Sequence, residues 1–102
     1  MSRYWLSFDL GLRGNYEALY EWLDGLGARE CGDSVATFEC GKTPDQIKKE
    51  LSPLLGPTAR VYIVGRTSKG GYVGRFVLGK RKRAPWEGYA AAATGLDEEE
   101  EG

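Results

Sequence analysis

The order of strand-like and helix-like segments is the feature that most constrains the fold of this chain. Strand patterns occupy residues 3–10, 28–31, 34–40, 59–65 and 72–78, and amphipathic helical patterns occupy residues 15–27 and 43–56. The order β-α-β-β-α-β is that of the split βαβ unit. We therefore predict an α+β fold, a ferredoxin-like βαββαβ sandwich with an additional C-terminal strand, in which both helices cover one sheet face.

The second helix carries the clearest local signals. Thr43 can cap it and Gln46 can complete a capping box, with Pro44 at the first helical position. Pro53 lacks an N–H and predicts an end or a kink near Ser52. The apolar spacing predicts four buried side chains: Ile47, Leu51, Leu54 and Leu55.

Alternation in the first strand separates two faces. Tyr4, Leu6 and Phe8 point to one face, which the helices would cover, and Trp5 and Ser7 point to the other. The second face would then carry an exposed tryptophan. Such a surface is typical of a place where a ligand or a second copy of the chain packs.

Composition excludes several kinds of chemistry. The chain has no histidine, which excludes Ser-His-Asp and Cys-His catalysis, and its two cysteines make no zinc site. No apolar run approaches the roughly 20 residues that span a bilayer, and no signal peptide precedes the first strand. We therefore expect a cytoplasmic protein with no membrane contact. Residues 1–80 would form one domain that includes the fifth strand, followed by a flexible tail at 81–102.

Charge is strongly segregated although the net charge is only −1. Residues 51–86 hold eight basic and no acidic side chains, whereas residues 87–102 hold six acidic and no basic ones. A basic block interleaved with Tyr72, Phe76 and Trp86 is typical of a nucleic-acid surface. The alternative is a solvated edge that prevents strand aggregation. The predicted phosphate contacts are Arg66, Lys69, Arg75, Lys80, Arg81, Lys82 and Arg83.

Residues 3–66 resemble a known group of small proteins. The resemblance is carried by the strand Tyr4–Leu10 with its aromatic–Asp ending, the helix at 15–23, the strand at 34–39, the helix start Thr43–Ile47 and the strand at 60–64. The group contains the small ferredoxin-like CRISPR-associated protein of spacer acquisition, second of the Cas series, the virulence-associated protein D ribonucleases and the SinR-like proteins. The resemblance stops after Arg66.

This resemblance implies a homodimer in which the aspartates that end the first strands approach each other and hold a divalent metal. It makes Asp9 the expected catalytic residue and Mg²⁺ ligand, since carboxylates suit this hard cation and the metal can activate water. Some members cleave RNA or DNA, and others only scaffold DNA. For Asp9 the alternative is a turn residue that binds its own backbone.

We therefore predict a homodimer that binds RNA or DNA; the role of Asp9 decides whether it also cleaves them as a magnesium-dependent endonuclease or only holds them. The alternative is a non-catalytic dimeric adaptor that holds a protein partner through the fifth strand and the tail.

Residues 69–76 are also faintly similar to the aromatic RNA-binding strand of RRM domains, but in that family the motif lies on the third strand, whereas this segment follows the fourth.

Overall fold

The computed structural model describes residues 1–80 and 83–91. Its elements, in chain order, are β1 (Ser2–Asp9), α1 (Tyr16–Gly25), β2 (Arg29–Gly32), β3 (Val35–Cys40), α2 (Pro44–Leu55), β4 (Arg60–Arg66) and β5 (Tyr72–Leu78). Residues 89–91 are also helical. The α+β class predicted from the sequence is confirmed.

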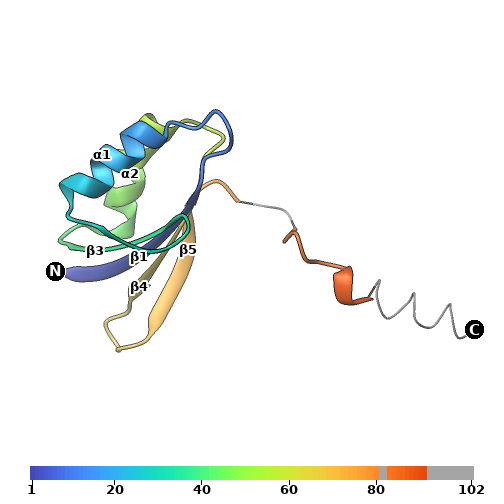
Figure 1. Ribbon diagram of the computed structural model, residues 1–102. Helices are drawn as coiled ribbons and strands as arrows, with labels where there is room; N and C mark the ends of the chain where they lie inside the picture. The colour runs from blue at the N-terminus through green and yellow to red at the C-terminus, as the bar shows by residue number, and fades with distance from the viewer. Residues whose placement is uncertain (81–82, 92–102) are drawn as a thin grey trace, which may run out of the picture.

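The five strands form one sheet in the order β2-β3-β1-β4-β5, and every neighbouring pair is antiparallel. β1 is the central strand, so each of its residues from Tyr4 to Ser7 pairs on both sides. Both helices lie on the same side of the sheet (Figure 1). The opposite side, which we call the open face, is covered by neither helix.

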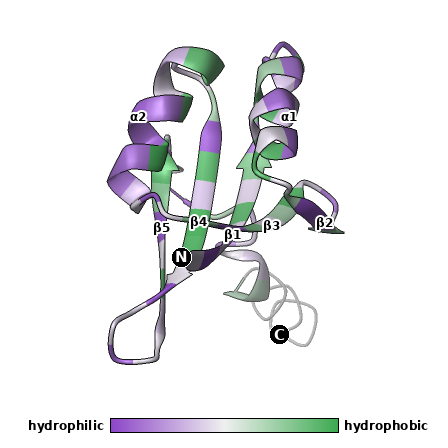
Figure 2. Cartoon of the chain, turned by 90° about the vertical axis from the view of Figure 1, so that its left-hand side faces the viewer, coloured by the Kyte–Doolittle hydropathy of each residue, from purple (hydrophilic) through white to green (hydrophobic). Residues whose placement is uncertain are grey.

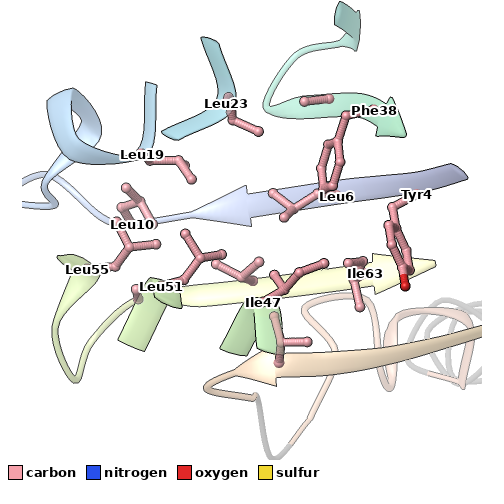
Figure 3. Packing of buried hydrophobic residues seen from close by; sticks show 14 of the residues in the cluster. Tyr4, Leu6, Leu10, Leu19, Leu23, Phe38, Ile47, Leu51, Leu55 and Ile63 are labelled. Carbon is pink, nitrogen blue, oxygen red and sulfur yellow. The ribbon is translucent and has the colours of Figure 1, made fainter. Parts of the chain in front are cut away.

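The core lies between the helices and the sheet. Leu6 from β1, Phe38 from β3 and Ile63 from β4 point toward leucines of the two helices (Figure 3). Leu6 and Leu19 are fully excluded from solvent. Burial of each such side chain contributes about 1.5–3 kcal/mol. The alternation predicted for β1 is confirmed, because Tyr4 and Leu6 are buried whereas Ser7 is exposed.

Side chains close the start of each helix. Asn15 Oδ1 accepts a hydrogen bond from the backbone N of Ala18 at 3.2 Å, and Asn15 Nδ2 donates to the carbonyl oxygen of Leu54 at 3.2 Å. The same residue therefore caps α1 and ties it to the end of α2. At α2 the predicted capping box between Thr43 and Gln46 is confirmed, with both hydrogen bonds present.

One of the two outcomes predicted for Pro53, an end of α2 near Ser52, is wrong, and so is the predicted burial of Leu54. The helix does not end near Ser52 but runs through Pro53 to Leu55, because Leu51 and Leu55 share the buried face and hold the last turn against the core. Leu54 is 40% exposed rather than buried. It follows Leu51 by three positions, at the margin of the apolar stripe, and its neighbour Leu55 takes the buried place.

β5 pairs with β4 of the same chain through a turn at Thr67–Gly71. Within the turn, the backbone N of Gly71 donates to Thr67 Oγ1 at 3.1 Å. A bulge interrupts the ladder between Val61 and Tyr62. The turn between β4 and β5 extends beyond the rest of the sheet (Figure 2). The fifth strand is therefore an edge strand of its own sheet.

Candidate functional site

The open face carries a group of four aromatic side chains, which we call the aromatic band: Trp5, Tyr62, Tyr72 and Phe76. Register explains why strands so far apart in sequence bring them together. Trp5 lies opposite Val64, and Tyr62 lies between Ser7 of β1 and Phe76 of β5. Residues directly opposite in an antiparallel pair share a face. The band therefore extends across β1, β4 and β5 on the open face.

The rings of the band form two edge-to-face pairs. Trp5 and Tyr72 have ring centroids 5.8 Å apart, and Tyr62 and Phe76 have centroids 5.0 Å apart. Tyr72 is 61% exposed and Phe76 is 45% exposed. Large aromatic rings held at this exposure present flat apolar surface to solvent, so the band can accept planar ligands.

Gly74 gives Tyr62 its position. A Cβ atom at Gly74 would lie 2.5 Å from Tyr62 Oη and 2.6 Å from Tyr62 Cε2. Only a residue without a side chain lets the tyrosine ring lie across β5 at this point. The glycine that interrupts the fifth strand is thus part of the band.

Charged side chains flank the aromatic band at both ends. At one end, Arg3 Nη2 pairs with Glu39 Oε1 at 2.7 Å. Arg66 follows Gly65, the residue of β4 that pairs with Tyr4, and its Cζ lies 5.8 Å from the centroid of the Tyr72 ring. At the other end, Arg60 pairs with Asp9. These pairs are solvent-exposed and contribute only about 0–1 kcal/mol each to stability.

Asp9 makes the turn contact that the alternative interpretation predicts. Its Oδ1 accepts a hydrogen bond from the backbone N of Gly11 at 3.1 Å, while Oδ2 faces the Arg60 guanidinium. Asp9 and Arg60 also line a shallow hollow of about 180 Å³ that opens beside the aromatic band; its other lining residues are Ser7, Phe8, Tyr62 and Phe76. The carboxylate therefore borders the same surface as the rings.

The described residues of the chain do not by themselves fit a magnesium site. Across residues 1–80 and 83–91, no group of three or more His, Cys, Asp or Glu side chains could hold a metal ion. Asp9 offers one carboxylate, and Arg60 places a positive charge directly against it. Mg²⁺ prefers octahedral oxygen coordination, so a second protomer would have to supply further ligands.

The predicted phosphate contacts are divided among several places. Arg66 lies on the open face, Lys69 in the β4–β5 turn and Lys80 just after β5. Arg75 points to the helix-covered side, where it pairs with Asp45 of α2 at 2.6 Å, and this hydrogen bond holds the pKa of the Asp45 carboxyl below its usual value. Arg83 pairs with Glu87. Arg81 and Lys82, like most of the predicted tail, lie outside the described residues.

Sequence reasoning missed Arg60 and Tyr62 as site residues. The signal that could have found them is the period of two along β4, which places Arg60, Tyr62, Val64 and Arg66 on one face. The apolar middle of the strand, Val61 to Val64, concealed this alternation.

Fold and site together define an α+β protein whose sheet has one face open, aromatic and bordered by arginines. No protein-family model matches the chain, and no curated protein or solved structure compared with it gives a significant match. No helix in the described part of the chain is long and apolar enough to span a membrane.

Proposed function

We propose that this protein binds single-stranded nucleic acid on the open face of its sheet. The observation that carries the proposal is the aromatic band beside Arg66. Proteins that bind single strands combine rings on which bases stack with cations that contact the backbone. Sheet-based RNA-binding domains use aromatic side chains on the sheet surface to stack two or three bases.

We infer that the fold is a ferredoxin-like sandwich to which β5 is added beside β4. The inference is supported by the element order β-α-β-β-α-β and by the arrangement of the first four strands as β2-β3-β1-β4. In this fold both crossover helices pack on one side. The other side is then available to a ligand.

The chemistry of the open face favours single strands over duplexes. Bases of a duplex are already stacked on each other, whereas unpaired bases can stack on Trp5, Tyr72 or Phe76. Each such stack contributes about 1–3 kcal/mol and tolerates any base. Arg66, Lys69 and Lys80 lie near the two ends of β5, where they can contact phosphates that flank the stacked bases.

The homodimer, its cytoplasmic location and magnesium-dependent cleavage at Asp9 stay predictions. A dimer compatible with the proposed function leaves the aromatic band accessible. Cleavage would require that a partner protomer complete the metal site, since within residues 1–80 and 83–91 Asp9 belongs to no group of carboxylates that could hold a metal ion, and it is paired with Arg60. The adaptor alternative stays the outcome if nucleic acid does not bind.

Binding of a fluorescently labelled single-stranded RNA or DNA, followed by anisotropy at about 50 mM salt, tests the proposal. Tyr72→Ala should raise Kd by roughly 5- to 100-fold because one stacking surface is lost. The matched control is Tyr20→Ala, which removes a ring of similar exposure (54%) from α1, on the helix-covered side of the sheet. It should leave Kd unchanged.

The cationic part of the site has its own matched pair. Arg66→Gln should weaken binding, whereas Arg75→Gln should not, because Arg75 lies on the helix-covered side. Absence of binding to both RNA and DNA at about 50 mM salt, where phosphate contacts are strong, would overturn the proposal and favour the adaptor.

A further inference from the structure

We propose that the acidic run at residues 97–101 binds the basic and aromatic open face and competes there with nucleic acid. The chain would thus carry its own competitor. This inference rests on the proposed function and adds to it a regulated state. It is argued from charge, from an ion pair within the described residues and from the length of the chain.

The charges of the two parts of the chain are complementary. Residues 1–86 hold 14 basic and nine acidic side chains, a net charge of +5, whereas residues 87–102 hold six acidic and no basic ones. The C-terminal segment, with a net charge of −6, therefore slightly exceeds in magnitude the charge of everything before it. Opposite charges of this size attract over roughly 8–10 Å at moderate salt.

The first acidic residue of the segment already shows this pairing. Glu87 Oε2 lies 3.1 Å from Arg83 Nε, so the last cation of the basic run is paired with a carboxylate from the acidic segment. The next acidic residue after Glu87 is Asp97, and four glutamates follow it. The five carboxylates at residues 97–101 can form further pairs with any cations within their reach.

Such cations are present around the open face. Arg66, Lys69 and Lys80 make no ion pair within residues 1–80 and 83–91, whereas Arg3, Arg60 and Arg75 are each paired. Arg66 lies over the Tyr72 ring, so a carboxylate that pairs with it covers one of the stacking surfaces. These are also the cations that we propose contact phosphate. Carboxylates of residues 97–101 and phosphates of the nucleic acid would therefore compete for them.

The chain is long enough for the contact. Sixteen residues lie between Lys80 and Asp97, and the seventeen steps of the chain from one to the other allow a span of at most about 55–60 Å. The eight residues of β1 measure about 27 Å from end to end. The acidic run can therefore reach every cation of the open face. A tethered segment of this length acts at an effective concentration in the millimolar range.

The experiment compares two triple variants of the full-length protein, each of which loses three negative charges. In the tail variant Glu99, Glu100 and Glu101 are replaced by glutamine. In the control variant Glu17→Gln, Glu21→Gln and Asp24→Asn neutralise exposed positions on α1. The probe is the labelled single strand at about 50 mM salt, and the readout is Kd from anisotropy.

The tail variant should bind about tenfold more tightly than the wild type, and the control variant less than twofold. The difference should shrink toward none at about 300 mM salt, because ion pairs at the surface are screened. Amide NMR shifts of Arg66 and Tyr72 should differ between the wild type and the tail variant without nucleic acid. Those of Tyr20 should not.

Equal affinities of the wild type and the tail variant would overturn the competitor while leaving nucleic-acid binding in place. Equal gains in the two triple variants would also overturn it, since long-range charge alone would then explain the effect. Failure of all three proteins to bind would instead overturn the proposed function. Unchanged NMR shifts at Arg66 and Tyr72 would show that the run does not occupy this face.

Discussion

At the scale of single residues, Gly74 has the most specific role in the site. Its missing side chain lets the Tyr62 ring lie across β5, with Tyr62 Oη 2.5 Å from where a Cβ would be. The ring holds Phe76 edge-on at 5.0 Å. A methyl group at position 74 would therefore displace the Tyr62 ring of the aromatic band and leave the core packing unchanged.

We expect Gly74→Ala to raise the Kd for single-stranded nucleic acid about three- to tenfold. The free energy of unfolding should change by less than about 1 kcal/mol, because displacement of the half-buried Tyr62 ring is offset by the lower chain entropy of alanine in the unfolded state. Anisotropy and urea unfolding measure the two quantities. Gly41→Ala is the control, since nothing lies within 4 Å of its added Cβ. A loss of stability without a loss of affinity would contradict this role.

At the scale of elements, the start of α2 is held from two sides. The capping box joins Thr43 to Gln46, and Tyr4 Oη donates to the carbonyl oxygen of Lys42 at 2.6 Å, which ties the helix start to β1. Burial raises the pKa of the Tyr4 hydroxyl, which therefore stays protonated and able to donate. The box satisfies backbone donors that the helix itself leaves without a partner.

Thr43→Ala should lower the free energy of unfolding by about 1 kcal/mol, the usual cost of losing a threonine cap. Urea unfolding followed by circular dichroism measures it. Ser68→Ala in the exposed β4–β5 turn is the control and should change the value by less than about 0.5 kcal/mol. If Thr43→Ala and Ser68→Ala were equally stable, the capping box would stabilise the helix no more than hydrogen bonds from its backbone N–H groups to water.

The elements also show what the sequence can predict. Helix caps depend on neighbouring residues, so the box at Thr43 was predictable, and strict alternation made the faces of β1 predictable. The continuation of α2 through Pro53 was not predictable, because burial of Leu55 outweighs the lost backbone hydrogen bond. The aromatic band needed the register of β4 against β1 and β5, which no local pattern contains. For the same reason Arg75 could not be assigned to the helix-covered side.

At the scale of the whole molecule, affinity should depend on salt in proportion to the cations that contact phosphate. Arg66, Lys69 and Lys80 together predict a slope of log Kobs against log salt near −2, since each contact with a single strand contributes about −0.7. Anisotropy titrations between about 50 and 200 mM salt, made on the tail variant, measure the slope without the internal competitor. Arg66→Gln should reduce it by about 0.7 and Arg75→Gln should not. A slope near zero would show that binding is not electrostatic.

The central place of β1 has a consequence for the order in which the molecule forms. Tyr4 pairs with Phe38 on one side and with Gly65 on the other, so β1, which precedes both of its partner strands in the sequence, finds them late. A nascent chain that has reached Cys40 can close one edge of β1, but the other edge stays unpaired until Arg66 has emerged. Pairings this distant in sequence slow folding and keep strand edges exposed meanwhile. During synthesis, the strand that later organises the sheet is therefore the one most open to association with other chains.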